Sequence, residues 1–336
     1  MRWSPGLNLL TGENGAGKTN ILEGINIVSG WGPLERGAKT LSMPTWGSGS
    51  SEVQLTGELE SGGIIRVKIS RRYMLRLDDK SVTAADLRWN IPVLTFLPDD
   101  MSIVEGSSAF RRRLLDMLLA LIVPSYAMRL AEYRRGVRQK AVFLKRGMPA
   151  MIADRALLPL AAWIWRMRIE GVKLLSSCLE GMSELTPVKI TLSLKRGGAG
   201  FDDDCENDYA KAVIANRGRE AAVKFPVVGP HRDDIIIMAG ERLASEALSR
   251  GLRRRTAIAM MLAAADGVKR KIGRDPVLLL DEVTAELDSS GRTLLFESLL
   301  SRETQVFAAT AEPFVEKFPG LIHRVSEGRV TESYEN

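Results

Sequence analysis

Cysteine and histidine are scarce in this chain of 336 residues, which contains two of each. Two cysteines, Cys178 and Cys205, cannot build a disulfide framework, and their scarcity fits a reducing compartment such as the cytosol. The longest stretches without a charge, such as residues 117–128, fall short of the roughly 18 apolar residues that a membrane span needs. Residues 1–10 are too polar for a signal peptide. These absences predict a cytoplasmic protein without a membrane partner.

A large excess of one sign of charge is also missing. Lys and Arg together number 47 against 41 Asp and Glu, which gives a formal net charge of +6. This balance permits a nucleic acid partner but does not require one, so the placement of the positive charges matters more than their sum. With 45% hydrophobic residues, the chain is able to bury a full core, and its length suggests about two domains.

The N-terminal part of the chain carries two different apolar patterns. Residues 7–10 form an apolar run, followed by a glycine-rich segment and then by helical spacing over residues 20–29, which predicts strand, loop and helix. Over residues 52–82 apolar and polar residues alternate, which predicts an antiparallel meander. Residues 30–51 are rich in Gly, Ser and Pro and are expected to form the connecting loop.

The rest of the chain begins with a helical segment and ends with a βαβ pattern. Residues 108–185 have helical spacing with breaks at Pro124 and at residues 147–149, which predicts three helices that pack as a bundle. An apolar run at 277–280 is typical of a buried parallel strand. The elements expected after the bundle are a strand at 188–194, a helix at 208–224, a strand pair at 235–243, a helix at 252–271, the strand at 277–280, a helix at 289–300 and a strand at 305–310.

A phosphate-binding motif stands between the first strand and the first helix. Residues 12–19 read Gly-Glu-Asn-Gly-Ala-Gly-Lys-Thr, which fits the P-loop pattern. Glycines allow a tight turn whose N–H groups face phosphates at a helix N-terminus. Lys18 is expected to reach the β and γ phosphates of ATP, and the Thr19 hydroxyl is expected to bind Mg²⁺. The predicted nucleotide contacts are Gly12, Glu13, Asn14, Gly15, Ala16, Gly17, Lys18 and Thr19.

The matching Walker B strand is residues 277–280, which are followed by Asp281 and Glu282. A buried strand that ends in two acids brings one carboxylate to the metal and one to the attacking water. On this interpretation Asp281 helps to hold Mg²⁺ and Glu282 polarises the water. Many proteins contain an apolar strand that ends in Asp-Glu, so the assignment of this strand as Walker B depends largely on the presence of the P-loop. Glu282 and Lys18 are the predicted catalytic residues.

A Ser-x-Gly sequence, Ser249 to Gly251, lies between these two motifs at the expected start of a helix. By itself it predicts only a helix cap. Its place about thirty residues before the Walker B strand, with Asp288 after that strand, follows the motif order of ABC-type ATPases. There the signature of one subunit closes over the γ phosphate held by the other, because a helix N-terminus attracts an anion. Ser249 and Gly251 are therefore predicted contacts in trans, and Asp288 is a further predicted nucleotide contact.

Several segments, taken in order, resemble the RecF family, bacterial recombination mediators of the ABC and SMC superfamily. The resemblance covers nearly the whole chain, and the order and spacing of its segments are more specific than any one of them. Besides the signature, the segments are 12–23, Phe-Leu-Pro-Asp-Asp at 96–100, 106–116, Pro-Ser-Tyr at 124–126, Gly-Pro-His-Arg-Asp-Asp at 229–234, 281–288 and 305–312.

The resemblance implies an α/β P-loop NTPase of ABC type, with a mixed sheet in the ATPase lobe, a mainly helical second lobe and no long coiled coil. We expect residues 1–100 and 227–336 to form the ATPase lobe and residues 101–226 the helical lobe. The resemblance also implies an ATP-dependent homodimer that binds double-stranded DNA and single-strand/double-strand junctions near gaps. Its further implications are partnership with RecR, with RecO and RecA downstream, and a role in DNA replication, repair and the SOS response.

Three departures from the family pattern stand out. The family usually has a strand pair before the P-loop strand, so an edge of the sheet and adenine contacts are expected to be missing here, with a misassigned start codon as the explanation. The family signature usually carries glutamines where this chain has Arg250 and Leu252. After the strand at 305–309, Thr310 stands near the place where ABC transporters have a histidine that senses the γ phosphate.

Positive charge gathers in two regions. Arg253, Arg254 and Arg255 fall in the first turns of the helix after the signature, where cations oppose the helix dipole. An anion is expected there, either the partner's triphosphate or a DNA backbone, although solvated arginines remain an alternative. The second region lies on the helical lobe, where the resemblance raises DNA contact above the ordinary expectation of solvated charges. The predicted DNA contacts are Arg111, Arg112, Arg113, Arg134, Arg135 and Arg138, beside Lys140.

The two histidines do not predict a metal site, because neither has a cysteine or a second histidine near it in the sequence. His231 is expected to make structural hydrogen bonds, and His323 is expected at the surface. Trp163 and Trp165 are expected in the core. The function predicted overall is a weak, DNA-stimulated ATPase of DNA repair and replication restart. The alternatives are an ABC-type ATPase subunit of another system, such as a transporter, and a DNA-binding scaffold that does not hydrolyse ATP.

Overall fold

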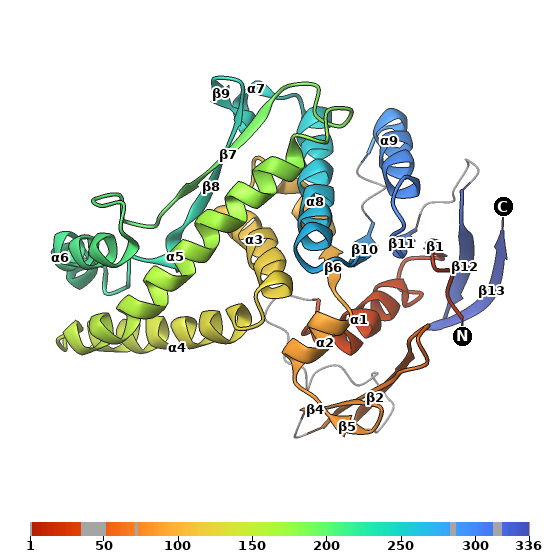
Figure 1. Cartoon of the computed structure of the whole chain (residues 1–336), viewed down its shortest axis with the longest axis horizontal. Coiled ribbons are helices and arrows are strands. Elements are labelled where there is room, and N and C mark those ends of the chain that lie inside the picture. The colour runs from red at the N-terminus through yellow and green to blue at the C-terminus, as the bar shows by residue number, and fades with distance from the viewer. Residues whose placement is uncertain (1, 35–51, 71–72, 283–286, 312–317, 336) are drawn as a thin grey trace. The chain divides into compact units, whose positions relative to one another are not determined.

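The computed structural model describes residues 2–34, 52–70, 73–282, 287–311 and 318–335 (Figure 1). Contacts divide the chain into unit 1, Met1–Pro98 with Val268–Asn336, and unit 2, Asp99–Gly267. The sequence assigned residues 227–267 to the ATPase lobe. By contacts they belong to unit 2, because β8 (Asp234–Ala239) pairs along its whole length with β7 (Ile190–Lys195). The division into functional lobes stays a prediction.

Unit 1 contains a mixed six-stranded sheet in the order β13-β12-β1-β11-β10-β6. Neighbouring strands are parallel, except that β13 runs antiparallel to β12. Burial on both faces explains why β1 and β10 read as nearly continuous apolar runs. The strands are β1 (Leu7–Thr11), β6 (Val93–Phe96), β10 (Val277–Asp281), β11 (Val306–Thr310), β12 (Leu321–Ser326) and β13 (Arg329–Glu335).

The helices of unit 1 are α1 (Lys18–Val28), α2 (Ala84–Asn90) and α9 (Ser289–Leu300). Helix α1 begins directly after the glycine-rich loop and buries Leu22 against Leu10, Leu279 and Phe307 of the sheet. By the usual value for a fully buried leucine, this burial stabilises the junction by about 2 kcal/mol. The P-loop is thus fixed between the end of β1 and the start of a helix anchored in the core.

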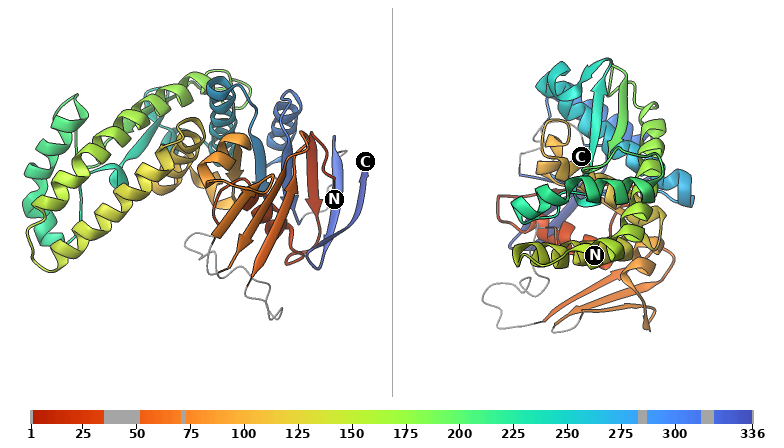
Figure 2. Two further views of the ribbon diagram at one scale, coloured as in Figure 1. Left: turned by 60° about the horizontal axis from the view of Figure 1, so that its bottom comes forward. Right: turned by 90° about the vertical axis from the view of Figure 1, so that its left-hand side faces the viewer.

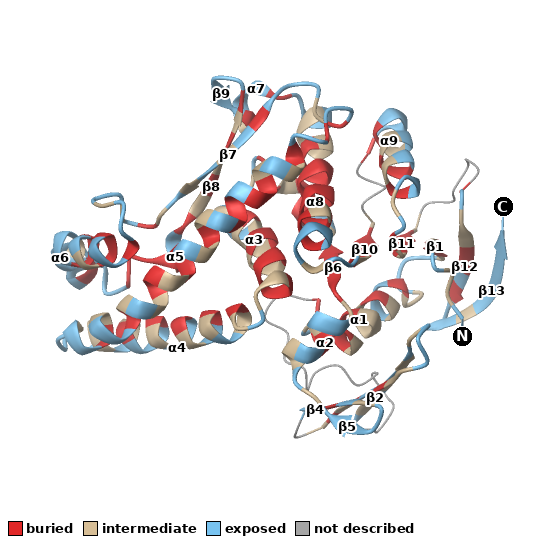
Figure 3. Cartoon of the chain, in the orientation of Figure 1, coloured by how far each residue is buried: buried red, intermediate tan, exposed pale blue. Residues whose placement is uncertain are grey.

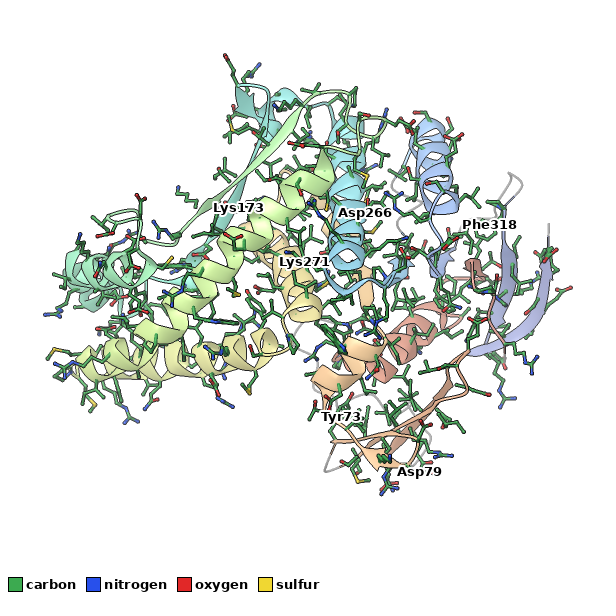
Figure 4. The ribbon with its side chains drawn as sticks, in the orientation of Figure 1. Tyr73, Asp79, Lys173, Asp266, Lys271 and Phe318 are labelled. Carbon is green, nitrogen blue, oxygen red and sulfur yellow. The ribbon has the colours of Figure 1, made fainter. Side chains whose placement is uncertain are left out.

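A second, antiparallel sheet in unit 1 has the order β2-β3-β4-β5 (Figure 2, orange). It consists of β2 (Val53–Glu58), β3 (Ile64–Ile69), β4 (Tyr73–Leu77) and β5 (Lys80–Ser81). In Figure 4 the labels Tyr73 and Asp79 mark the start of β4 and the turn that follows it. Alternate residues of β3 pack with Ile27 of α1 and Leu87 of α2, which confirms the predicted meander.

A 3-10 helix, Pro98–Ser102, leads into unit 2. It is followed by the three predicted helices, α3 (Ser108–Ile122), α4 (Tyr126–Lys145) and α5 (Met151–Leu179). Pro124 separates the first two, and α5 continues through Pro159. The remaining elements are β7, α6 (Cys205–Val223), a short 3-10 helix at Pro230–Arg232, β8, β9 (Arg242–Leu243), α7 (Ala244–Ala247) and α8 (Arg250–Ile272), which crosses the boundary between the units. Strands β7, β8 and β9 form one antiparallel sheet.

Helix α8 is apolar around its circumference between Ala257 and Ala265, and all these residues are buried. Figure 3 shows this stretch in red. A helix that is apolar all round belongs in the core of a protein. None of the helices within the described ranges is long and apolar enough to cross a bilayer.

Candidate nucleotide site

The P-loop takes a backbone path that requires glycine. Gly12, Gly15 and Gly17 have φ angles of 154°, 82° and 101°. A Cβ on Gly12 would lie 2.3 Å from the carbonyl oxygen of Val325, and one on Gly17 would lie 2.7 Å from Cα of Gly328. The β12–β13 turn therefore supports the loop closely, and the Gly328 N–H donates to the Ala16 carbonyl at 2.7 Å.

Lys18 is buried at the base of the loop, with only 5% of its surface exposed. Its ammonium donates to the carbonyls of Gly12 at 2.9 Å and Glu13 at 3.1 Å. It also lies 3.7 Å from a carboxylate oxygen of Glu282. A buried ammonium whose partners are carbonyls of the phosphate loop is suited to bind an anion that enters that loop.

The side chains of Thr19 in α1 and Asp281 at the end of β10 are joined by hydrogen bonds. The Thr19 hydroxyl donates to the two carboxylate oxygens of Asp281, at 3.1 Å and 3.3 Å. Burial raises the pKa of Asp281, and the nearby Glu282 adds to that effect, whereas the Thr19 hydrogen bond and Lys18 act in the opposite direction. A cation would relieve the cost of this buried carboxylate.

Hydroxyl and carboxylate oxygens are ligands that Mg²⁺ accepts, and Mg²⁺ commonly uses one or two protein ligands beside phosphates and water. Thr19 and Asp281 therefore fit such an ion. Within the described residues there is no cluster of three or more His, Cys, Asp or Glu side chains suited to a metal. The ion would supply positive charge beside the phosphates.

Glu282 follows β10 in an unusual conformation, with a φ of 50°. Its N–H donates to the Ala309 carbonyl at 2.9 Å, and its carboxylate accepts a bond from the Ala311 N–H at 3.1 Å. The side chain is partly exposed, at 29%. Glu282 is thus close to Lys18 and open enough to contact water, whereas Asp281 next to it is buried.

The remaining predicted nucleotide contacts are Asp288, Ser249 and Gly251. Asp288 caps α9 by accepting from the Gly291 N–H at 2.7 Å. Residues 283–286, which complete the segment between Glu282 and Leu287, are outside the described ranges. Ser249 and Gly251 are exposed at the start of α8 in unit 2, and the Ser249 hydroxyl accepts from the Leu252 N–H at 3.4 Å. Their contact with a partner's nucleotide stays a prediction, as does the role of Asp288.

Arg111 is not part of an exposed basic face, contrary to our expectation. It is buried, and its guanidinium binds both carboxylate oxygens of Asp234, at 2.6 Å and 3.1 Å. Arg112 donates to the Asp233 carbonyl, and Arg113 pairs with Asp100. These acids lie far along the chain or across a turn, so helical spacing did not reveal them. Contact of these arginines with DNA stays a prediction. Their hydrogen bonds and ion pairs within the protein do not favour it.

The α4 arginines differ from those of α3. Arg134, Arg135 and Arg138 are exposed, and Arg134 alone of the three has an ion pair within the described residues, with Asp116 at 3.1 Å. Lys140, in contrast, is fully buried between Asp154 and Glu220. The exposed cations of α4 therefore remain available for an anionic partner.

The structure confirms one histidine prediction and corrects the other. His231 contacts the Tyr133 hydroxyl at 2.7 Å and the Pro226 carbonyl at 3.1 Å, as expected of a structural residue. His323 is not at the surface but fully buried on β12, between Asn8 and Ser333. The sequence pattern around His323 did not indicate its burial or its contact with Ser333 on the neighbouring strand β13.

The tryptophans and the Gly-Pro-His-Arg-Asp-Asp segment have structural roles. Trp165 is fully buried and donates to Asp233 at 2.9 Å, whereas Trp163 is half-buried beneath the Arg129 guanidinium. Asp233 also accepts hydrogen bonds from Arg168 at 2.7 Å and the Gly197 N–H at 2.8 Å.

The sequence did not reveal two backbone groups beside the P-loop and Glu282, the N–H groups of Ala311 and Gly328. A backbone donor is present in almost every residue type, so no residue type indicates it.

Comparisons with known proteins find relatives over nearly the whole chain. A family model described as an AAA domain matches residues 3–91. The DNA replication and repair protein RecF of Heliobacterium modesticaldum is 30% identical, over 98% of this chain and 94% of that protein. RecF of Deinococcus deserti is 32% identical, over 97% of this chain and 89% of that protein.

Solved structures share the fold. The recombination mediator protein RecF with ATP, of the RecFOR pathway, has a TM-score of 0.83 at 19% identity and covers 99% of this chain and 93% of its own. An Smc head bound to the C-winged helix domain of ScpA has a TM-score of 0.50 at 18% identity, over 100% of this chain and 92% of that one. The fold is that of a P-loop ATPase of ABC type, and the chain belongs to the RecF family of DNA replication and repair proteins.

Proposed function

We propose that this protein is an ATP-dependent dimerising clamp that binds duplex DNA near single-stranded gaps, helps to load recombinase and hydrolyses ATP slowly. The observation that carries the proposal is the convergence of Lys18, Thr19, Asp281 and Glu282 from the P-loop, α1 and the end of β10. Such an arrangement serves phosphoryl transfer, in which positioning and charge stabilisation do the work.

Each residue of this group has a distinct task. Lys18 binds the β and γ phosphates of ATP, and Thr19 and Asp281 would hold Mg²⁺. Glu282 accepts a proton from the attacking water, whose oxygen bonds to the γ phosphorus while the bond to the bridging oxygen breaks, which gives ADP and phosphate. The proposed partners are RecR and RecO, with RecA acting downstream. RecR and RecO are supported by the relatives named RecF and by the solved RecF structure, which is described as part of the RecFOR pathway.

Duplex DNA is proposed to bind the exposed face of α4. Arg135 and Arg138 are exposed and have no ion pair within the described parts of the chain. Residues 134, 135 and 138 lie within about one turn, so their guanidinium groups are able to reach neighbouring phosphates. Ser249 and Gly251 would contact the partner subunit's ATP when two subunits close head to tail.

Glu282→Gln tests the mechanism. We expect the variant to bind ATP with unchanged affinity, to lose about 100-fold or more of its phosphate release, and to accumulate as an ATP-bound dimer in light scattering. A monomer at saturating ATP would contradict the clamp. Wild-type protein that releases no phosphate under DNA saturation would instead favour the scaffold without hydrolysis, and stimulation by duplex DNA would argue against a transporter subunit.

Arg138→Ser tests the DNA surface, with Arg292→Ser on α9 of unit 1 as the control. Loss of one phosphate contact is expected to lower duplex affinity and to reduce the slope of log affinity against log salt by about 1. If affinity and slope match those of the control, the α4 face does not bind DNA.

A further inference from the structure

Glu282 is joined to strand β11 by two hydrogen bonds that lie on either side of Thr310. Its N–H donates to the Ala309 carbonyl at 2.9 Å, and its carboxylate oxygen Oε2 accepts from the Ala311 N–H at 3.1 Å. Strands β10 and β11 are parallel neighbours with Asp281 opposite Ala309, so the main-chain bond continues the strand pairing past its last ladder position. The side-chain bond reaches Ala311, which directly follows β11. Main chain and side chain of Glu282 are thereby held against the same strand end.

The backbone of Glu282 has an unfavourable conformation that neighbouring contacts must stabilise. A φ of 50° places a residue other than glycine in the left-handed region. Such a conformation costs roughly 1–3 kcal/mol and persists only where neighbouring contacts determine it. The two hydrogen bonds of Glu282, to Ala309 and Ala311, are contacts of this kind.

The two carboxylate oxygens of Glu282 have different partners. Oε1 lies 3.7 Å from the Lys18 ammonium, whereas Oε2 accepts from Ala311. A triphosphate in the loop competes with Glu282 for Lys18, because phosphate oxygens carry more charge than one carboxylate. Within the described residues, Glu282 is the acceptor of the Ala311 N–H, and this bond does not involve Lys18. With ATP bound, the bond to Ala311 is therefore the contact that continues to orient Glu282.

We propose that the backbone N–H of Ala311, at the end of β11, is a positioning group for hydrolysis that holds the Glu282 carboxylate toward the attacking water. The inference rests on the proposed ATPase function and adds a task for the strand that follows Walker B in the sheet. A general base must stay within hydrogen-bonding distance of its water, and one fixed donor on the opposite oxygen restrains its rotation. Since the donor belongs to the backbone, the position tolerates many side chains.

The decisive change removes the N–H and keeps every side chain. Replacing the Thr310–Ala311 amide by an ester, with the α-hydroxy analogue of alanine, keeps the Ala311 side chain. Ala311→Pro provides a second way to remove the donor, and Ala311→Ser is the matched control that keeps it. We expect the ester and the Pro variant to lose about 10- to 100-fold in kcat, which corresponds to one hydrogen bond to a charged group. KM and the Kd for ATP should stay within about twofold.

A double-mutant cycle separates positioning from general damage. In the Glu282→Gln background the ester should cause little further loss in kcat, since the carboxylate that it orients is already absent. An equal loss in both backgrounds, or a change in KM with kcat unaltered, would overturn the inference. Wild-type protein without hydrolysis would overturn the proposed ATPase as well, whereas normal hydrolysis by the ester protein would overturn this inference alone.

Discussion

The Thr19 hydroxyl lies 3.1 Å from the Asp281 carboxylate, although 262 positions separate the two residues in the chain. Thr19 stands in the first turn of α1, and Asp281 ends β10. Their contact joins the P-loop to the Walker B strand. It also brings together the hydroxyl and carboxylate oxygens that we propose as Mg²⁺ ligands.

Thr19→Val should raise the Mg²⁺ concentration that ATP binding requires. Valine keeps the branched shape but removes the hydroxyl, so one oxygen ligand and the bond to Asp281 are lost together. We expect the Mg²⁺ concentration for half-maximal ATP binding to rise about tenfold. Titration calorimetry measures the change. Thr19→Ser, which keeps the hydroxyl, should behave like the wild type, and an equal effect of Val and Ser would contradict the assignment.

Lys18→Met should abolish ATP binding without unfolding the protein. Methionine retains the apolar stem but removes the charge that contacts the carbonyls of Gly12 and Glu13. The Kd for a fluorescent ATP analogue is expected to rise by at least about 100-fold. Lys145→Met, at the exposed end of α4, is the control. Comparable affinities of the two variants would remove Lys18 from the site.

The buried imidazole of His231 should make stability depend on pH. Burial lowers the pKa of His231 from 6.5 to about 4, and the nearby cations Arg232 and Lys140 act in the same direction, against the Pro226 hydrogen bond. Between these two values the unfolded chain binds the proton and the folded protein does not. Stability from this group is therefore complete above pH 6.5 and falls as the pH drops toward 4, by about 3 kcal/mol.

Urea denaturation at pH 7 and pH 4.5 measures this dependence. Other groups titrate over the same range, so the relevant quantity is the difference between wild type and His231→Gln, which cannot take up the proton. The variant should be less stable at pH 7 but should lose about 2 kcal/mol less on acidification. Parallel losses in the two proteins would show that His231 does not contribute.

Breaking the Arg111–Asp234 ion pair should lower the free energy of unfolding rather than remove a DNA contact. Asp234→Asn leaves the Arg111 guanidinium buried without its carboxylate, although carbonyls of Ile103 and Gly106 still accept from it. The side chain of Asp234 is 27% exposed, so we expect about 2 kcal/mol, below the 3–5 kcal/mol typical of a fully buried pair. Arg138→Ser should cost less than about 0.5 kcal/mol. Equal unfolding midpoints would contradict this distinction.

The convergence of the P-loop and Walker B residues was predictable because they sit in two short, contiguous motifs. Each motif follows a buried strand, and strand ends of a parallel sheet meet at one edge, so Lys18 and Asp281 were expected together. The helices of unit 2 were predictable from Pro124 and from the apolar spacing. Arg111 and His323 were not, because their partners Asp234 and Asn8 lie 123 and 315 positions away. Spacing along a segment shows which residues share a face but not what covers that face.

The contact between Gly328 and Ala16 makes the phosphate loop depend on a part of the chain that is distant in sequence. The supporting turn lies between β12 and β13, and β12 pairs with β1, the strand that leads into the loop. A substitution in this turn is therefore able to disturb the phosphate loop although it changes no residue of the P-loop motif.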